Sequence, residues 1–133
     1  MAAVGSVDVE LELIQWLQAK AGPGVVVRDE VDNQLLGELP TIQVQRLAAG
    51  GDDSFRLDRA LVDVDVYHST RAQAIALAGQ VRGWLLTDLP GARTDVAVFG
   101  RVSTVSPPAM RPYENTALRR VGATYQIYSH PVV

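Results

Sequence analysis

The stretch "DRALVDVDVYHSTR" (58–71) decides the fold, because the spacing of its apolar residues changes within it. Its first part alternates valines with Asp63, Asp65 and Tyr67, which predicts a strand with one apolar and one polar face. From Thr70 onward the apolar residues recur at intervals of three and four, which predicts an amphipathic helix. A strand that runs into such a helix indicates a sheet with helices on its apolar face.

Upstream, apolar residues at helical spacing predict a helix that ends at "GPG" (22–24), with Ser6 as its N-cap. "VVVRDEV" (25–31) predicts a short strand, followed by a polar loop. Ile42 and Val44 then alternate with glutamines, and the stretch as far as His68 predicts a long hairpin. We expect "AAGGDDS", at 48–54, to be its turn.

Downstream, "DLPG" (88–91) ends the second helix, and "TDVAVFGRVSTVS" (94–106) and "ALRRVGATYQIYSH" (117–130) predict two further strands. The predicted fold is therefore α+β, with an antiparallel sheet of four to five strands and both helices on one face. A chain of 133 residues has the size of one compact domain, which we expect to span 1–133.

Composition excludes several classes of protein. The chain has no cysteine, so thiolate metal sites and disulfides are ruled out. No apolar run is long enough to cross a membrane, and the first residues do not resemble a signal peptide, so we expect synthesis in a cytoplasm. Residues 1–65 carry 12 acidic and 5 basic side chains, and residues 66–133 carry 3 and 7. If these halves also separate in space, like subunits could meet head to tail.

Asp63 and Asp65 lie two residues apart and share the polar face of their strand. A carboxylate pair of this kind can hold Mg²⁺ in a nuclease, but such sites also need a third acidic ligand and a lysine. The lysine of this chain, Lys20, is far away in the sequence. We therefore favour a half-exposed strand whose carboxylates pair across the sheet with Arg46, Arg119 or Arg120.

Other catalytic signals are weak. His68 and His130 each end a predicted strand, where a surface or capping role is favoured over a metal or base role. The sequence has no nucleophile elbow, phosphate-binding glycine loop or dinucleotide fingerprint. We expect no enzymatic activity and no cofactor.

The segment "PPAMRPYENT" (107–116) combines three prolines with residue types that are frequent in protein interfaces, namely Met110, Arg111 and Tyr113. We predict an ordered contact arm with no role in the core. The alternative is an ordinary solvated connection.

These features together resemble the tail terminator (tail completion) proteins of long-tailed bacteriophages, especially minor tail proteins of actinobacteriophages. The resemblance rests on the opening helix "ELIQWLQA", a proline before an "IQV" strand, an "R-x-D-x-x-x-V-x-V-x-V-Y" strand leading into an Ala-rich helix, and a final "TYQIYSH".

The resemblance implies a homohexameric ring in the virion, at the head-proximal end of the tail, assembled in the host cytoplasm. Its partners would be the major tail tube protein and a head–tail connector protein, with genome DNA passing the lumen unbound. The family has no catalytic residue to carry over. Candidate contact residues for a neighbouring subunit or the tube are Asp63, Asp65, Met110, Arg111, Tyr113, Arg119 and Arg120.

The resemblance also implies that the Asp63/Asp65 face is exposed to the lumen or to a neighbour. Two other interpretations stay open at this point. One is a head-completion or neck connector protein of the same virion, and the other is a small metal-dependent nuclease that uses Asp63 and Asp65.

Overall fold

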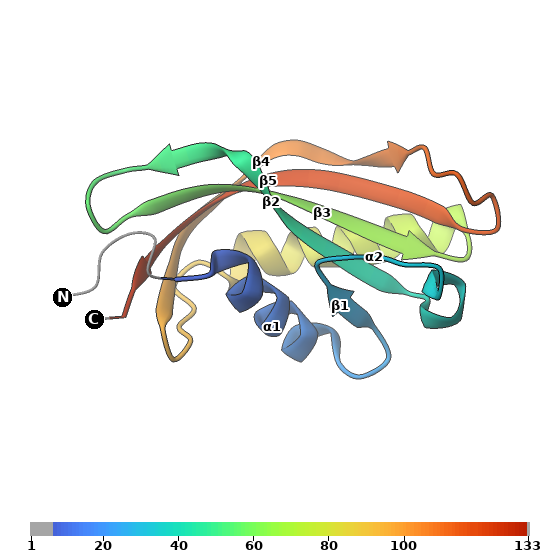
Figure 1. Ribbon diagram of the computed structural model, residues 1–133, viewed down its shortest axis with the longest axis horizontal. Helices are drawn as coiled ribbons and strands as arrows, with labels where there is room; N and C mark the ends of the chain where they lie inside the picture. Colours follow the sequence, from blue (N-terminus) through green and yellow to red (C-terminus); the bar gives the residue numbers. More distant parts are fainter. Residues whose placement is uncertain (1–6, 133) are drawn as a thin grey trace.

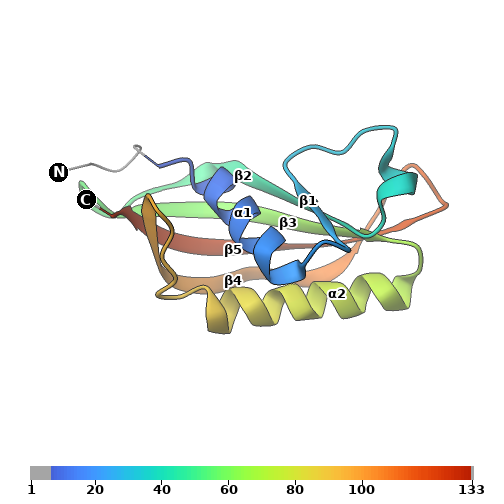
Figure 2. The same cartoon turned by 90° about the horizontal axis from the view of Figure 1, so that it is seen from below.

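The computed structural model describes residues 7–132, which form one five-stranded sheet with both helices on the same face (Figures 1 and 2). The strands are ordered β1-β2-β3-β5-β4, and every neighbouring pair is antiparallel except β1 and β2. The predicted α+β class is confirmed. The elements are α1 (Val9–Ala21), β1 (Val26–Arg28), a 3₁₀ turn η1 (Leu35–Glu38), β2 (Thr41–Asp52), β3 (Asp58–His68), α2 (Arg71–Gly83), a π-helical turn η2 (Trp84–Asp88), β4 (Ala97–Arg111) and β5 (Arg119–Pro131).

Helix α1 begins at a carboxylate cap. The Asp8 side chain accepts a hydrogen bond from the Leu11 N–H, which satisfies one of the free amides of the first turn. The predicted cap, Ser6, lies outside the described residues. Leu13 and Leu17 are fully buried against the sheet, and each contributes about 1.5–3 kcal/mol by leaving water. The helix ends at Gly22, whose φ of 83° favours glycine.

The first strand is shorter than predicted and runs the other way. β1 covers only three residues and pairs parallel with the start of β2, so an all-antiparallel sheet was wrong at this edge. The parallel direction is possible because the chain makes a long excursion through η1 before it returns as β2. This connection was predicted to be a polar loop, yet it carries the buried Leu35.

The hairpin is confirmed, but its turn is displaced. Ala48 to Asp52, predicted to be turn, belong to β2, and a register shift between Arg46 and Gly50 accommodates them. The connection to β3 is only residues 53–57. Gly50 has a φ of 95°, which a side chain would strain, and glycine therefore permits the backbone irregularity at this point of the strand. The glycine-rich stretch forms an irregular strand rather than the predicted loop.

Helix α2 begins where the sequence predicted. The Thr70 hydroxyl oxygen accepts a hydrogen bond from the Gln73 N–H at 3.2 Å, and the hydroxyl donates to the Gln73 side chain. The helix passes into η2 and stops before Pro90, as "DLPG" indicated. No helix within residues 7–132 is long and apolar enough to span a membrane.

The boundaries of the last strand pair were also misjudged. β4 continues to Arg111, so Pro107 to Arg111 are strand residues and the predicted arm is reduced to a turn at 112–118. Two prolines fit here because β4 is an edge strand, which needs amide donors on one side only. Three register shifts against β5 accompany them.

The main core lies between the helices and one face of the sheet. Alternate residues of β2, β3 and β5 point into it, including Val62, Val64 and Val66, as the alternation predicted. A smaller cluster lies on the opposite face, where Leu35, Tyr67 and Leu118 meet. The open face of the sheet is therefore covered at one end and bare elsewhere.

Candidate functional site

Asp63 and Asp65 lie on the open face of β3, as predicted, but they differ in exposure. The Asp65 side chain is 1% exposed and that of Asp63 is 22% exposed. The prediction that both carboxylates face a lumen or a neighbouring subunit is therefore wrong for Asp65, which other side chains of the same subunit cover.

Two guanidinium groups cover Asp65. Arg111 Nη1 lies 3.0 Å from Asp65 Oδ1, and Arg120 donates from Nε and Nη2 at 3.2 Å to the two carboxylate oxygens. The burial of Arg120 disfavours its charge, but its hydrogen bond to Asp65 and the charge of that carboxylate outweigh the burial and raise the pKa of Arg120. The carboxylate is thus held between cations from β4 and β5.

Arg111 reaches Asp65 because Gly122 lies between them. In the register of the sheet, Gly122 of β5 is opposite Asp65 on one side and Ala109 on the other. A Cβ at position 122 would overlap the Asp65 carboxylate and would lie 2.5 Å from Arg111 Nε. The missing side chain opens a passage across β5, and the Arg111 side chain fills it.

Asp63 forms the outer part of the same network. Its carboxylate accepts a hydrogen bond from the Thr124 hydroxyl across the β3–β5 pair and lies 3.5 Å from Arg111 Nη1. Two carboxylates and two guanidinium groups thus neutralise each other on this face. We call Asp63, Asp65, Arg111 and Arg120 the charge network.

The charge network is a poor place for a metal ion. A cation would have to displace Arg111 and Arg120 from the oxygens it needs. Within residues 7–132, no group of three or more His, Cys, Asp or Glu side chains is placed to hold a metal. The arrangement is that of an ion-pair network, and it does not favour the nuclease interpretation.

The predicted arginine partners were partly correct. Arg120 pairs with Asp65, as expected. Arg46 instead forms two hydrogen bonds, at 2.6 and 2.7 Å, with the buried Asp58, and Arg119 donates to the carbonyl oxygens of Thr116 and Leu118. Arg119 remains exposed at the end of the sheet.

The charge network continues into an aromatic pair. The Arg120 guanidinium lies 5.8 Å from the centre of the Tyr67 ring, and Tyr113 meets that ring edge-on at 5.2 Å. Burial raises the pKa of Tyr67 to about 12, and its hydroxyl donates to the Gln43 side chain at 2.8 Å. The prediction that this segment has no packing role is therefore wrong for Tyr113. Met110, by contrast, is 39% exposed and available for contact.

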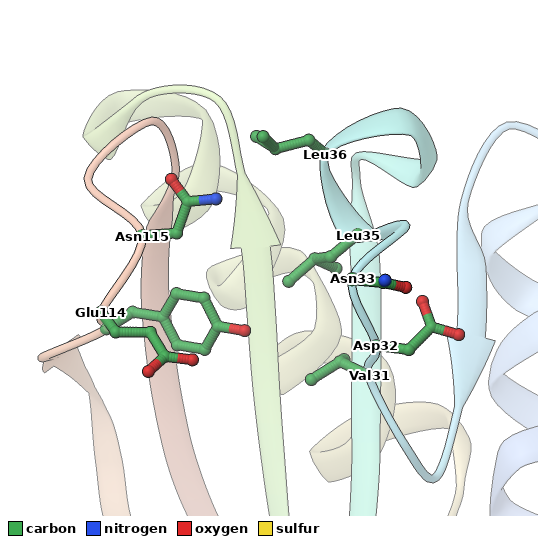
Figure 3. A pocket seen from close by; sticks show the side chains of 8 residues that line it. Val31, Asp32, Asn33, Leu35, Leu36, Glu114 and Asn115 are labelled. Atoms are coloured by element: carbon green, nitrogen blue, oxygen red, sulfur yellow. The ribbon is translucent and has the colours of Figure 1, made fainter.

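A pocket of about 450 Å3 opens beside Tyr113, between the β1–β2 connection and the β4–β5 turn (Figure 3). Its apolar wall consists of Val31, Leu35, Leu36 and Tyr113, and its polar residues are Asp32, Asn33, Glu114 and Asn115. Sequence reasoning missed it, although two adjacent leucines in a polar loop were a signal for local packing.

The two histidines have local partners. His68 ends β3, and its Nδ1 accepts a hydrogen bond from the Ser69 N–H at 2.8 Å, while burial lowers its pKa. His130 Nδ1 lies 2.8 Å from the Pro131 carbonyl oxygen. Both positions agree with the expected capping or surface role.

Comparison with known proteins gives a likeness of fold. No protein-family model matches the chain, and no curated protein sequence matches it significantly. Among solved structures, the chain is similar to one in the structure described as "Virion of native gene transfer agent (GTA) particle", with a TM-score of 0.69 and 17% identity. The two chains share one fold. The match covers 95% of this chain and 98% of the other, so neither chain adds a large element to the shared architecture.

Proposed function

We propose that this protein is a structural component of a phage-like virion, where it forms a ring that caps the head-proximal end of the tail tube. The ring ends tube polymerisation and presents a surface for head joining. The observation that carries this proposal is the fold shared, over nearly the full length of both chains, with a chain of a gene transfer agent particle. The resemblance of sequence pattern to tail terminators supports the same role.

The site chemistry supports a structural role. The carboxylates that could have served catalysis are engaged by arginines. What the molecule offers instead is two dissimilar ends and two dissimilar edges (Figure 1). The pocket and η1 lie at one end of the long axis, and the β2–β3 turn with the exposed Phe55 lies at the other. A subunit of this kind can contact different proteins above and below a ring.

The proposed assembly is a homohexamer, with the major tail tube protein on one side and the head–tail connector protein on the other. Genome DNA passes through the lumen without specific binding. Met110, Arg119 and the outer part of the charge network remain candidate contact residues, since they keep exposed atoms in the monomer.

Deletion of the gene tests this role. We expect tails of uncontrolled length that carry no heads, because polymerisation continues until tube subunits run out. Supply of the intact chain in trans should restore uniform length. Tails of normal length that lack heads would instead assign the protein to the neck, and normal infectious particles would contradict a virion role.

A further inference from the structure

The charge asymmetry of the sequence becomes an asymmetry of the two sheet edges. β1, β2 and β3 come from the acidic first half and lie together, whereas β5 and β4 come from the basic second half. α1 packs on the β1–β2 side, and α2 packs across β3, β5 and β4. The interleaving of strands that could have mixed the charges does not occur.

The acidic edge contains a groove of about 290 Å3 between α1 and β1. Leu11, which is 46% exposed, lies in it beside Ile14, and Asp8, Glu10 and Asp29 supply carboxylates. The cation of this groove, Arg28, is engaged by Asp32 at 3.4 Å and by Glu38 at 3.1 Å. The groove is thus apolar with an acidic border.

The opposite edge has the complementary character. Residues 89–112 contain three arginines and one carboxylate. Arg111 belongs to the charge network, so the cations that this edge presents are the exposed Arg93 and Arg101. Arg101 is exposed on β4, as are Val105 at 55% and Met110 at 39%. Pro107 and Pro108 lack amide donors, and the register shifts bend the strand, so this edge is unsuited to adding another strand. Contact there must be made by side chains.

We propose that the β4 edge of one copy docks into the α1–β1 groove of the next, which is the subunit contact of the ring proposed above. Val105 and Met110 meet Leu11 and Ile14, and the arginines face the acidic border. The docking partner is a second copy of this chain, because both complementary surfaces are on this chain, at the two opposite edges of one sheet. Such a contact is heterologous, so each copy uses both of its edges. Successive copies close into a ring if the rotation from one copy to the next is a whole fraction of a full turn.

Engineered cysteines test the contact directly, since the chain has none of its own. A Leu11→Cys protein is mixed with a Val105→Cys protein, either free in solution or bound on tail tubes, and treated with a short thiol-specific cross-linker. We expect dimers in the mixture and almost none with either protein alone. A chain that carries both substitutions should give a ladder that ends at the number of subunits in the ring.

The matched control replaces Leu11→Cys with Ile75→Cys, whose side chain is 40% exposed on α2 and does not line the α1–β1 groove. It should not cross-link to Val105→Cys. Dimers from Leu11→Cys alone would reveal a symmetric contact and overturn the proposal. So would capped tubes in which Leu11→Cys and Val105→Cys never join; the capping role would then stand with a different interface.

Charge reversal gives an independent measurement. Arg101→Glu is expected to weaken self-association about tenfold or more, equivalent to about 1.4 kcal/mol, whereas Arg101→Lys should change it little. Arg71→Glu, at the exposed start of α2, is the control with the same change of charge. Association measured by sedimentation should also weaken as salt rises from about 0.1 M to 1 M. Equal effects of Arg101→Glu and Arg71→Glu would contradict a contact at the β4 edge.

Discussion

Asp65 shows how a single carboxylate can be buried in a sheet of otherwise ordinary pattern. Its two oxygens are engaged by Arg111 and Arg120, so removing its charge leaves two guanidinium groups near each other without a partner. Breaking a buried pair in this way costs about 3–5 kcal/mol, and partial exposure of both arginines places this case at the lower end.

We therefore predict that Asp65→Asn lowers the free energy of unfolding by about 3 kcal/mol. Asp63→Asn, at the more exposed position, should lower it by about 1 kcal/mol or less. Urea unfolding of both variants measures the difference. Equal and small losses would mean that the charge network contributes little to stability.

Gly122 makes a sharper test, because it acts only by lacking a side chain. Gly122→Ala would push a methyl group into Asp65 and Arg111, and we expect a loss of about 2–4 kcal/mol from overpacking and ion-pair disruption. Gly24→Ala is the control, since a Cβ there meets nothing within 4 Å. A neutral Gly122→Ala would show that Arg111 can leave Asp65 without consequence.

Two buried tyrosines should make the free energy of unfolding fall at alkaline pH. Burial raises the pKa of Tyr67 and of Tyr125 to about 12, against an ordinary value near 10. In the unfolded chain both lose their protons near pH 10, while the folded chain retains them. Their contribution is therefore complete below about pH 10 and is lost as pH rises toward about 12.

Stability measured across this range should fall more steeply for the parent protein than for Tyr67→Phe. That variant should itself lose about 1 kcal/mol near neutral pH, the contribution of the hydrogen bond to Gln43. Absorbance of tyrosinate should show that the ionisations of Tyr67 and Tyr125 occur only as pH approaches about 12. A parallel fall in both proteins would show that the fall has another origin.

At the scale of elements, sequence patterns predicted those features that depend on contacts between residues close together in the chain. The start of α2 at Thr70 and the inward face of β3 follow from spacing and capping chemistry, which the sequence displays directly. The parallel direction of β1 could not be predicted, since three residues carry no signal for their partner. The strand through Pro107 could not be predicted from composition, because prolines favour loops over central strands and only an edge strand tolerates them.

The candidate site followed the same division. Alternation predicted that Asp63 and Asp65 share a face, and residue type suggested Arg120 as a partner. The burial of Asp65 depends on Arg111, which is 46 positions away in the sequence and crosses a glycine in an intervening strand. Spacing within one strand contains no information about such a contact.

Gly79 offers a prediction for a whole helix. It lies in α2, is exposed, and a Cβ there would meet nothing within 4 Å. Gly79→Ala should stabilise the monomer by about 0.5–1 kcal/mol, because alanine loses less backbone freedom on folding. Thermal unfolding measures this. A stabilised monomer that no longer assembles would reveal a close subunit contact over α2 and argue against a ring held by the sheet edges alone.

At the scale of the molecule, the two ends should have separable roles. Phe55 is 64% exposed at the β2–β3 turn, and Leu36 is 51% exposed in the pocket at the opposite end. Phe55→Ser and Leu36→Ser should each change the free energy of unfolding by about 0.5 kcal/mol or less, as is usual for surface positions.

In complementation of the deleted gene, we expect one variant to give tails of irregular length and the other to give tails of normal length without heads. Tail lengths and attached heads are counted in electron micrographs. The same defect from both variants would contradict a division of contacts between the two ends.

The charge network has a consequence for the passage of DNA, whose phosphates carry a high density of negative charge. A bare row of carboxylates would repel phosphates, and a bare row of arginines would trap them by releasing counterions. Paired as they are, these side chains leave a face that forms hydrogen bonds and yet has little net field. If this face lines the channel of the proposed ring, it would neither repel nor bind the phosphates of a genome, which could then pass in either direction.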